Sequence, residues 1–359
     1  MNASDILQIR LNSQMLLPGT SRSVHDVVSR MGAMQAQDYP SMKWAIGSRA
    51  LGSTEQEVEA ALDSGELLRT HVLRPTWHVV SPEDIRWMLE LTAPRIRDKM
   101  KPRDAQLGLT PAIINQSKTI LIKAMQDGTH KTKEELNVLW NQASIPTTEY
   151  RDAHLLMHAE LDGLVCSGTS VGKFRTYALL EERAPIKQTI TRDEALANLA
   201  IRYFTGHCPA TLQDFIWWSG LTVGDAKQAL ASVQSEFHAE TVGTQTFLFP
   251  NDRTDFNMEK GIVHLLPAFD EFIIAYQDRT AALVPEQFQK IVSSNGVFRP
   301  ALLLDGKVVG VWKRASKRDK LDIEITTFEV LKPMIDSKIR EAFLQYGRFH
   351  GLKAEIRYS

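Results

Sequence analysis

The chain has 359 residues, of which 43% are hydrophobic and 24% charged, and its formal net charge is −1. This composition is ordinary for a globular protein, and the length predicts two or three units rather than one small domain. A net charge near zero argues against a histone-like or tail-driven nucleic-acid binder. It still permits a local basic surface, which is what DNA binding requires.

Two cysteines occur, Cys166 and Cys208, and neither has the spacing of a metal-ligand motif. They are too few for a disulfide framework, which fits a reducing cytosol. The N-terminus has no basic and apolar signal segment, and no apolar run approaches the roughly 20 residues that a membrane helix needs. We therefore expect a soluble cytoplasmic protein without membrane segment, metal or cofactor.

Helix starts are marked along the chain by a Ser or Thr followed three residues later by an acid. Such a pair can bond the free N–H groups of the first helical turn reciprocally. At Thr110-Pro111 a capping residue and a first-turn proline give the same signal without the acid. The pairs are Ser23/Asp26, Thr54/Glu57, Ser81/Asp84, Thr132/Glu135, Thr191/Glu194, Thr211/Asp214 and Thr222/Asp225.

Short strand-like stretches with turn residues follow three of the helix groups, at 73–80, 164–180 and 237–249. The order of several helices and then two short strands therefore recurs three times. This order is that of the winged helix, a helix-turn-helix followed by a β-hairpin. We predict winged-helix units over 1–105, 106–188 and 189–266, in a mainly helical α+β fold with a concave arrangement.

The pattern changes after residue 266. Residues 301–304 and 307–312 flank Asp305-Gly306 and predict a β-hairpin with a tight turn. A strand at 321–328, a helix at 332–346 and a last strand at 353–358 complete an α+β element over 267–359. The loop of this element is rich in Lys and Arg, which indicates either a DNA-binding surface or a solvated face.

Several stretches, in this order along the chain, resemble the AlkZ/YcaQ-like family of tandem winged-helix DNA glycosylases. The resemblance covers at least residues 20–315, and it implies three winged helices that form a concave DNA-binding surface. The stretches are MQAQDYP at 34–40, LRPTWH at 73–78, AELDGL at 159–164, TLQDFIWWSGL at 211–221, LLPAFDEFIIAYQDR at 265–279 and LDGKVVGVWK at 304–313.

The family signature is a Gln, an apolar residue and then Gln or Asp, together with a Thr-x-His element. Here these read Gln35-Ala36-Gln37 and Thr76-Trp77-His78, so the resemblance implies catalytic roles for Gln35, Gln37, Thr76 and His78. It also suggests alkylated or crosslinked double-stranded DNA as the partner, bound by a monomer. The expected DNA-binding residues are Arg74, Lys43, Lys313, Arg314, Lys317, Arg318 and Lys320.

The glutamines limit the chemistry. A purine alkylated at N3 or N7 is cationic and leaves readily, so the enzyme must position water and stabilise charge. A Gln side chain can orient water and offer its carbonyl oxygen to positive charge, but it cannot act as a general base. If the chain is extended at 35–37, both glutamines point to one side; if it is helical, they diverge. Pro40 disfavours a helical Tyr39 and thus favours the extended form.

Other candidate sites have simpler interpretations. His154 and His158 are four residues apart but lack the acid and the third ligand of a metal site. The acids at Asp270-Glu271 and Asp278 resemble catalytic pairs, yet buried acids tied to arginine or backbone are the simpler reading. Asp38 follows the motif and could supply an acid, although a neighbouring position should point elsewhere. Lys43 could form a Schiff base, but nothing near it in sequence indicates a lowered pKa.

Two further functions share the predicted fold, since fold alone does not fix function. One is a DNA-binding regulator, and the other is a damage-recognition factor that shields lesions. The Gln-x-Gln and Thr-x-His elements favour the enzyme over both, and no effector pocket or dimerisation helix is evident.

Overall fold

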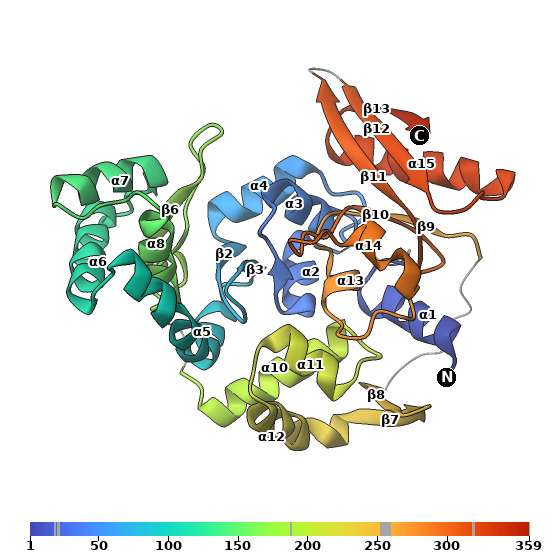
Figure 1. Ribbon diagram of the computed structural model, residues 1–359, viewed down its shortest axis with the longest axis horizontal. Helices are drawn as coiled ribbons and strands as arrows, with labels where there is room; N and C mark the ends of the chain where they lie inside the picture. Colours follow the sequence, from blue (N-terminus) through green and yellow to red (C-terminus); the bar gives the residue numbers. More distant parts are fainter. Residues whose placement is uncertain (18, 20–21, 187–188, 252–259, 318–319, 359) are drawn as a thin grey trace.

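Three groups of helices and strands with the same order of elements make up most of the molecule (Figure 1). The computed structural model describes all residues except 18, 20–21, 187–188, 252–259, 318–319 and 359. Helices predominate over strands, and both occur, in agreement with a mainly helical α+β fold. Within the described residues, no helix combines the length and the apolar character needed to cross a membrane.

The first two groups run helix, strand, helix, helix, strand, strand, and the third lacks the first of these strands. The first contains α2 Val24–Met31, β1 Met34–Gln35, α3 Tyr39–Gly47, α4 Glu55–Ser64, β2 Leu68–His71 and β3 Trp77–Val80. The second contains α6 Pro111–Met125, β4 Lys131–Thr132, α7 Lys133–Gln142, α8 Arg151–Leu161, β5 Val165–Ser167 and β6 Thr176–Leu179. The third contains α10 Arg192–Gly206, α11 Leu212–Ser219, α12 Val223–Val233, β7 Phe237–Val242 and β8 Gln245–Pro250.

The strands of these groups also pair in the same order. The first two sheets are ordered β1-β3-β2 and β4-β6-β5, so the short strand between the first two helices pairs with the last strand. In the third group this short strand is reduced to a single bridge between Ala210 and Leu248 of β8. Shared topology without evident sequence identity explains why the repeat is visible in the pattern of elements alone.

Helices α1 Ala3–Ser13, α5 Ile85–Leu107 and α9 Leu180–Arg183 flank or connect these groups. The C-terminal part forms a five-stranded sheet of order β13-β12-β11-β10-β9. Its elements are β9 Val263–Leu266, α13 Glu271–Ile274, α14 Phe288–Ile291, β10 Ala301–Leu304, β11 Lys307–Lys317, β12 Lys320–Thr327, α15 Pro333–Phe349 and β13 Lys353–Tyr358. Two short 3-10 helices lie at Gln234–Glu236 and Pro285–Gln287.

One boundary differs from the sequence prediction. We placed residues 263–266 at the end of the third unit, but β9 pairs antiparallel with β10 along its length, from Val263 opposite Leu304 to Leu266 opposite Ala301. This strand therefore belongs to the C-terminal sheet. A four-residue apolar strand carries no signal of its partner, which lies some 40 residues away in sequence.

The predicted helix caps are mostly confirmed. Ser23, Thr54, Thr132, Thr191 and Thr211 each form a reciprocal capping box with the acid three residues later. Thr110 and Thr222 cap α6 and α12 through their side chains. Ser81 is the exception, because residues 82–84 form a turn and α5 begins only at Ile85, after Asp84.

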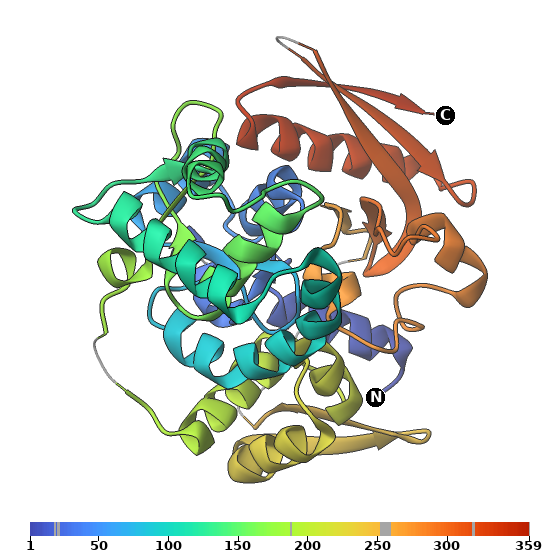
Figure 2. The same ribbon diagram turned by 60° about the vertical axis from the view of Figure 1, so that its left-hand side comes forward.

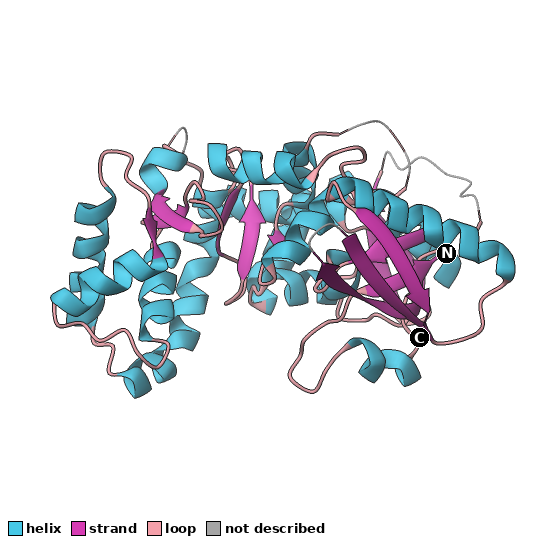
Figure 3. Ribbon diagram, turned by 90° about the horizontal axis from the view of Figure 1, so that it is seen from above, coloured by secondary structure: helices cyan, strands magenta, loops and turns pink. Residues whose placement is uncertain are grey.

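The first group is packed between the third group and the C-terminal sheet. One apolar core joins residues such as Leu68 and Val72 to Tyr203 and Trp218 of the third group. A second core joins Met34 and Trp44 of the first group to Trp312, Phe343 and Tyr346, and α15 lies between the sheet and the first group (Figure 2). The second group has a separate core around Trp140 and lies at the opposite end of an elongated body (Figure 3).

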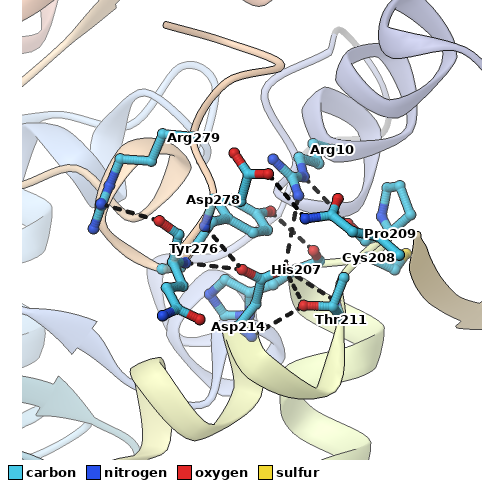
Figure 4. Close-up of polar contacts among 12 residues, drawn as sticks. Arg10, His207, Cys208, Pro209, Thr211, Asp214, Tyr276, Asp278 and Arg279 are labelled. Carbon is cyan, nitrogen blue, oxygen red and sulfur yellow. Dashed lines mark hydrogen bonds and ion pairs between the residues drawn. The ribbon is translucent and has the colours of Figure 1, made fainter. Parts of the chain in front are cut away.

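A polar network fixes helix α1 to the third group and to the segment after α13 (Figure 4). Arg10 donates from Nε to the carbonyl oxygen of Pro209 at 3.1 Å, and its guanidinium carbon lies 3.5 Å from the ring centroid of Tyr276. The Tyr276 hydroxyl donates to the carbonyl oxygen of His207 at 2.9 Å, and Asp214 accepts the N–H of Gln277 at 2.8 Å. The stretch at 265–279 therefore has a structural role in joining three parts of the chain.

Candidate active site

Gln35 and His78 lie directly opposite each other in the sheet of the first group. They are paired residues of the antiparallel strands β1 and β3, and the N–H of Ala36 donates to the carbonyl oxygen of Trp77 at 2.7 Å. Only 8% of Gln35 is exposed. Its side-chain oxygen accepts the backbone N–H of Gln37 at 3.2 Å, so the first glutamine of the motif holds the second.

Gln37 lies between a strand and a helix, and its side chain is exposed. The extended conformation expected at the motif is confirmed for Gln35, which lies in β1. The expectation that Pro40 keeps Tyr39 out of a helix is wrong. Tyr39 is the first residue of α3, and Pro40 occupies the first turn, where its missing N–H costs no helical hydrogen bond. Asp38 caps this helix by accepting the N–H of Ser41 at 2.8 Å.

His78 is fully buried and neutral. Its Nδ1–H donates to the carbonyl oxygen of Thr76 at 3.0 Å, and burial lowers its pKa to about 3. Among the described residues, His78 Nε2, Thr76 Oγ1 and Arg74 Nε are buried without a hydrogen-bond partner. We expected a catalytic role for His78 and a DNA contact for Arg74; His78 is buried within β3, and Arg74 is half-buried beside it in sequence.

A buried carboxylate, that of Glu271, lies against the motif. Its Oε1 accepts the backbone N–H of Gln35 at 2.8 Å. Burial raises the pKa of Glu271 to about 7, against the opposing effect of the Arg74 charge. Its Oε2 lies 3.9 Å from Nε2 of His207, whose pKa burial lowers to about 3, so this contact is not an ion pair near neutral pH. The expected tie of a buried acid to the backbone is thus confirmed at Glu271.

Its neighbour Asp270 is tied to an arginine, as expected. Arg49 donates to both carboxylate oxygens at 2.8 and 2.9 Å, and both side chains are fully buried. Asp278 accepts the backbone N–H and the hydroxyl of Thr280 at 2.8 and 2.7 Å. These contacts account for both acids as structural groups.

Gln37 lines a cavity of about 320 Å³ between the first two groups. Tyr39, Trp77, Arg69 and Arg175 also line it. Arg69 donates from Nε to the carbonyl oxygen of Ala36 at 3.1 Å, and its guanidinium carbon lies 4.4 Å from the ring centroid of Trp77. Arg69 is therefore attached to the middle residue of the Gln-x-Gln motif.

Glu160 also lines this cavity. It is buried, it accepts the indole N–H of Trp77 at 3.2 Å, and it pairs with Nδ1 of His71. Sequence reasoning missed Arg69, Glu160 and Arg175. They come from a strand, a helix and a loop, and only the quoted stretch at 159–164 contained one of them, with no indication of a role.

The other expected DNA-binding residues are largely neutralised by carboxylates. Lys43 contacts Glu55 and Glu59 at 2.5 Å each. Burial opposes its charged form, but these two acids outweigh burial and raise the pKa of Lys43, which argues against a Schiff-base lysine. Lys313 pairs with Glu324 at 2.9 Å and Lys320 with Glu355 at 2.6 Å.

Arg314 also has partners, since its Nη1 lies 3.3 Å from both the Tyr346 hydroxyl and Nε2 of His350. The side chain of Lys317 and the whole of Arg318 lie outside the described residues. The basic hairpin is therefore less strongly charged at its described positions than its sequence indicates.

His154 and His158 share one acid. Asp104 accepts from His154 Nδ1 at 3.1 Å and from His158 Nε2 at 3.0 Å. Within the described part of the chain, no group of three or more His, Cys, Asp and Glu side chains is arranged to hold a metal ion.

Comparison with known proteins identifies relatives over most of the chain. The model of the family described as DNA glycosylase AlkZ-like matches residues 28–349. The interstrand DNA cross-link repair glycosylase of Streptomyces sahachiroi is 24% identical over 325 residues, which cover 85% of either chain. The structure of the DNA glycosylase AlkZ from the same organism has a TM-score of 0.82 at 19% identity and covers both chains completely.

Proposed function

Because this chain belongs to the AlkZ-like family of DNA glycosylases, we propose that it removes purines alkylated at N3 or N7 from double-stranded DNA. The reaction is hydrolysis of the N-glycosidic bond by water, without a covalent enzyme intermediate. We include purines joined in an interstrand crosslink among the substrates. The printed name of the Streptomyces relative, which covers 85% of this chain, supports that extension.

We further propose that the three groups are winged helices and that together they form a concave surface for DNA. Support comes from the recurring order of helices and strands and from the shared strand order of the first two sheets. In this proposal the units span 1–105, 106–188 and 189–262, and the remainder is the added α+β element. The protein acts as a monomer on DNA in the cytoplasm.

The exposure of Gln37 is the observation that carries the catalytic assignment. A side chain that positions water must reach the substrate, and Gln37 is exposed at the rim of a cavity, whereas Gln35 and His78 are buried. The Gln37 amide can hold water on one side and direct its carbonyl oxygen toward the positive charge that develops on the sugar. Since the cationic base leaves readily, no general base is needed early in the reaction.

Gln35, Thr76 and His78 then act as positioning residues. Gln35 fixes the backbone N–H of Gln37, and Glu271 fixes the backbone N–H of Gln35. The neutral imidazole of His78 lies opposite Gln35 and is itself held by the carbonyl group of Thr76. This chain of contacts limits the conformations that Gln37 can adopt. An amide that is already held in position can stabilise a transition state more strongly than a mobile one.

The test is incubation with a duplex that contains one N7-methylguanine, followed by measurement of the released base. We expect release by the natural protein and none by Gln37→Ala, with duplex affinity nearly unchanged because a water-positioning group acts mainly in the transition state. Full release by Gln35→Ala/Gln37→Ala would contradict the catalytic assignment. Duplex binding without release by the natural protein would favour the damage-recognition factor.

A further inference from the structure

The cavity beside Gln37 has one wall from the first group and one from the second. The β5–β6 hairpin of the second group is attached to the end of α4 in the first. Thr169 donates from its hydroxyl to the carbonyl oxygen of Asp63 at 2.8 Å, and Ser170 donates its N–H to Oδ1 of Asp63 at 2.8 Å. Arg183 donates to the carbonyl oxygens of Asp63 and Leu62 at 2.8 and 2.6 Å. The contacts of Thr169 and Ser170 fix the hairpin against α4, and those of Arg183 fix α9 to the same helix end.

Positive charge exceeds negative charge around this cavity. Four cationic residues line it, against two carboxylates, namely Arg69, Lys133, Lys173 and Arg175 against Glu134 and Glu160. Glu160 already pairs with His71 and Trp77, and Lys133 already pairs with Asp152 at 2.8 Å. Among the described residues, neither Lys173 nor Arg175 forms an ion pair or a side-chain hydrogen bond. Glu160 also attracts the Arg69 guanidinium, so the uncompensated positive charge lies mainly on Lys173 and Arg175.

Two of these cations are held against aromatic rings. The guanidinium carbon of Arg175 lies 4.5 Å from the ring centroid of Tyr39, and that of Arg69 lies 4.4 Å from the centroid of Trp77. Stacking of this kind fixes the plane of a guanidinium and leaves N–H groups at its edge for an anion. It also leaves the rings of Tyr39 and Trp77 partly covered, which disfavours a stacked base.

We propose that this cavity binds a phosphodiester group of the strand that carries the damaged base, through Arg69, Lys173 and Arg175. Paired guanidinium groups recognise phosphate oxygens by charge and by bidentate geometry. A phosphate held there places the adjoining sugar beside Gln37, since Arg69 is attached to Ala36 of the same motif. The volume of about 320 Å³ is at the lower end of the roughly 300–1,000 Å³ typical of ligand sites. The inference rests on the proposed function.

The first test is the salt dependence of duplex binding by Arg175→Gln. Each phosphate contact contributes a slope of about 0.9 to log affinity against log salt, so one lost contact removes a roughly threefold to fourfold change between 50 and 200 mM salt. The matched control is Arg348→Gln, an exposed arginine in the last turn of α15. We expect the slope to fall by about one for Arg175→Gln and to stay unchanged for Arg348→Gln.

The second test locates the phosphate. Duplexes with N7-methylguanine, stabilised by a 2′-fluoro substituent, carry one neutral methylphosphonate at successive positions around the lesion. At one position next to the lesion, the neutral group should weaken binding by the natural protein more than binding by Arg175→Gln, because the contact between Arg175 and that phosphate is already lost in the variant. Equal effects on both proteins at every position would overturn the proposal.

A third arm separates DNA from a free phosphate compound. Inorganic phosphate at matched ionic strength should compete with DNA no better than chloride. Strong competition that is lost in Arg175→Gln, without coupling to any methylphosphonate, would assign the cavity to a free anion and overturn the proposal. Failure of the glycosylase function is a separate result, since it is read from base release by the natural protein and not from binding.

Discussion

The side-chain oxygen of Gln35 accepts the backbone N–H of Gln37, so the two glutamines of the motif have different surroundings and different expected roles. Gln35 is nearly buried between β3 and Glu271, whereas Gln37 is exposed at the cavity. A substitution of Gln35 and a substitution of Gln37 should therefore slow catalysis to different extents.

Gln35→Met, which keeps the size of the side chain but removes the acceptor, should slow base release by about 2- to 12-fold. This is the rate equivalent of one neutral hydrogen bond of about 0.5–1.5 kcal/mol. Gln37→Ala should abolish release, while Gln37→Asp should retain it because a carboxylate also accepts from water and attracts positive charge. Single-turnover release from a saturated enzyme measures both. Equal losses in Gln35→Met and Gln37→Ala would contradict the division of roles.

Glu271→Gln should change the pH dependence of stability. Burial raises the pKa of Glu271 from 4.5 to about 7, so the unfolded chain releases this proton first as the pH rises. Between about pH 4.5 and 7 the folded state therefore binds more protons, and the contribution of Glu271 to stability falls by up to about 3 kcal/mol as the pH rises. Glu271→Gln lacks this effect and should gain stability relative to the natural protein from pH 5 to 8.

Denaturant unfolding at several pH values measures this difference. His78 and His207 have pKa values lowered to about 3, so they stabilise the fold as the pH rises toward 6.5, which is the opposite sign. Both histidines are present in the two proteins, so their contributions cancel in the comparison. A difference in stability that stays constant from pH 5 to 8 would show that Glu271 keeps an ordinary pKa.

Arg49→Met should be strongly destabilising. It leaves the fully buried carboxylate of Asp270 without its partner, and loss of one member of a buried pair costs about 3–5 kcal/mol. Arg192→Met is the control, because it removes an arginine from a largely exposed pair with Asp225 and should have little effect. Thermal unfolding of both variants provides the measurement. A similar small shift in both would mean that water reaches Asp270.

Lys317→Gln/Arg318→Gln should weaken binding of any duplex and reduce its salt dependence, without changing base release from the saturated enzyme. Lys and Arg side chains that contact phosphates strengthen binding but carry no sequence information. Lys320→Gln should have a smaller effect, because Lys320 is already paired with Glu355. Affinity titrations at several salt concentrations test this, and a change confined to one DNA sequence would argue for base contacts.

Local features were predictable from the sequence, and contacts between distant segments were not. Helix caps such as Thr54 and Thr191 depend on residues three apart, and these were correctly predicted. The same rule failed at Ser81, where the turn before α5 replaces the expected first helical turn. The position of Pro40 was misread because proline disfavours a helical residue before it, yet is also accepted in a first turn.

The candidate site was predictable only in part. The family motif led to Gln35, Gln37 and His78, and the structure brings Gln35 and His78 together across β1 and β3. The motif gave no indication that Glu271 contacts Gln35 from 236 residues away, or that Arg175 reaches Tyr39. Such contacts depend on how the three groups pack against one another. The sequence also does not show which of its Lys and Arg side chains are already neutralised by a carboxylate.

The attachment of the β5–β6 hairpin to Asp63 means that the position of Gln37 and the wall that faces it come from different parts of the chain, and evolution can alter them independently. The strand pair that holds Gln37 belongs to the first group, but the facing wall is a short loop from the second. Insertions or substitutions at 168–175 would widen or recharge that wall while leaving Gln35 and His78 untouched. Among homologues, the sequence changes that alter which lesions are accepted should accordingly concentrate in this loop.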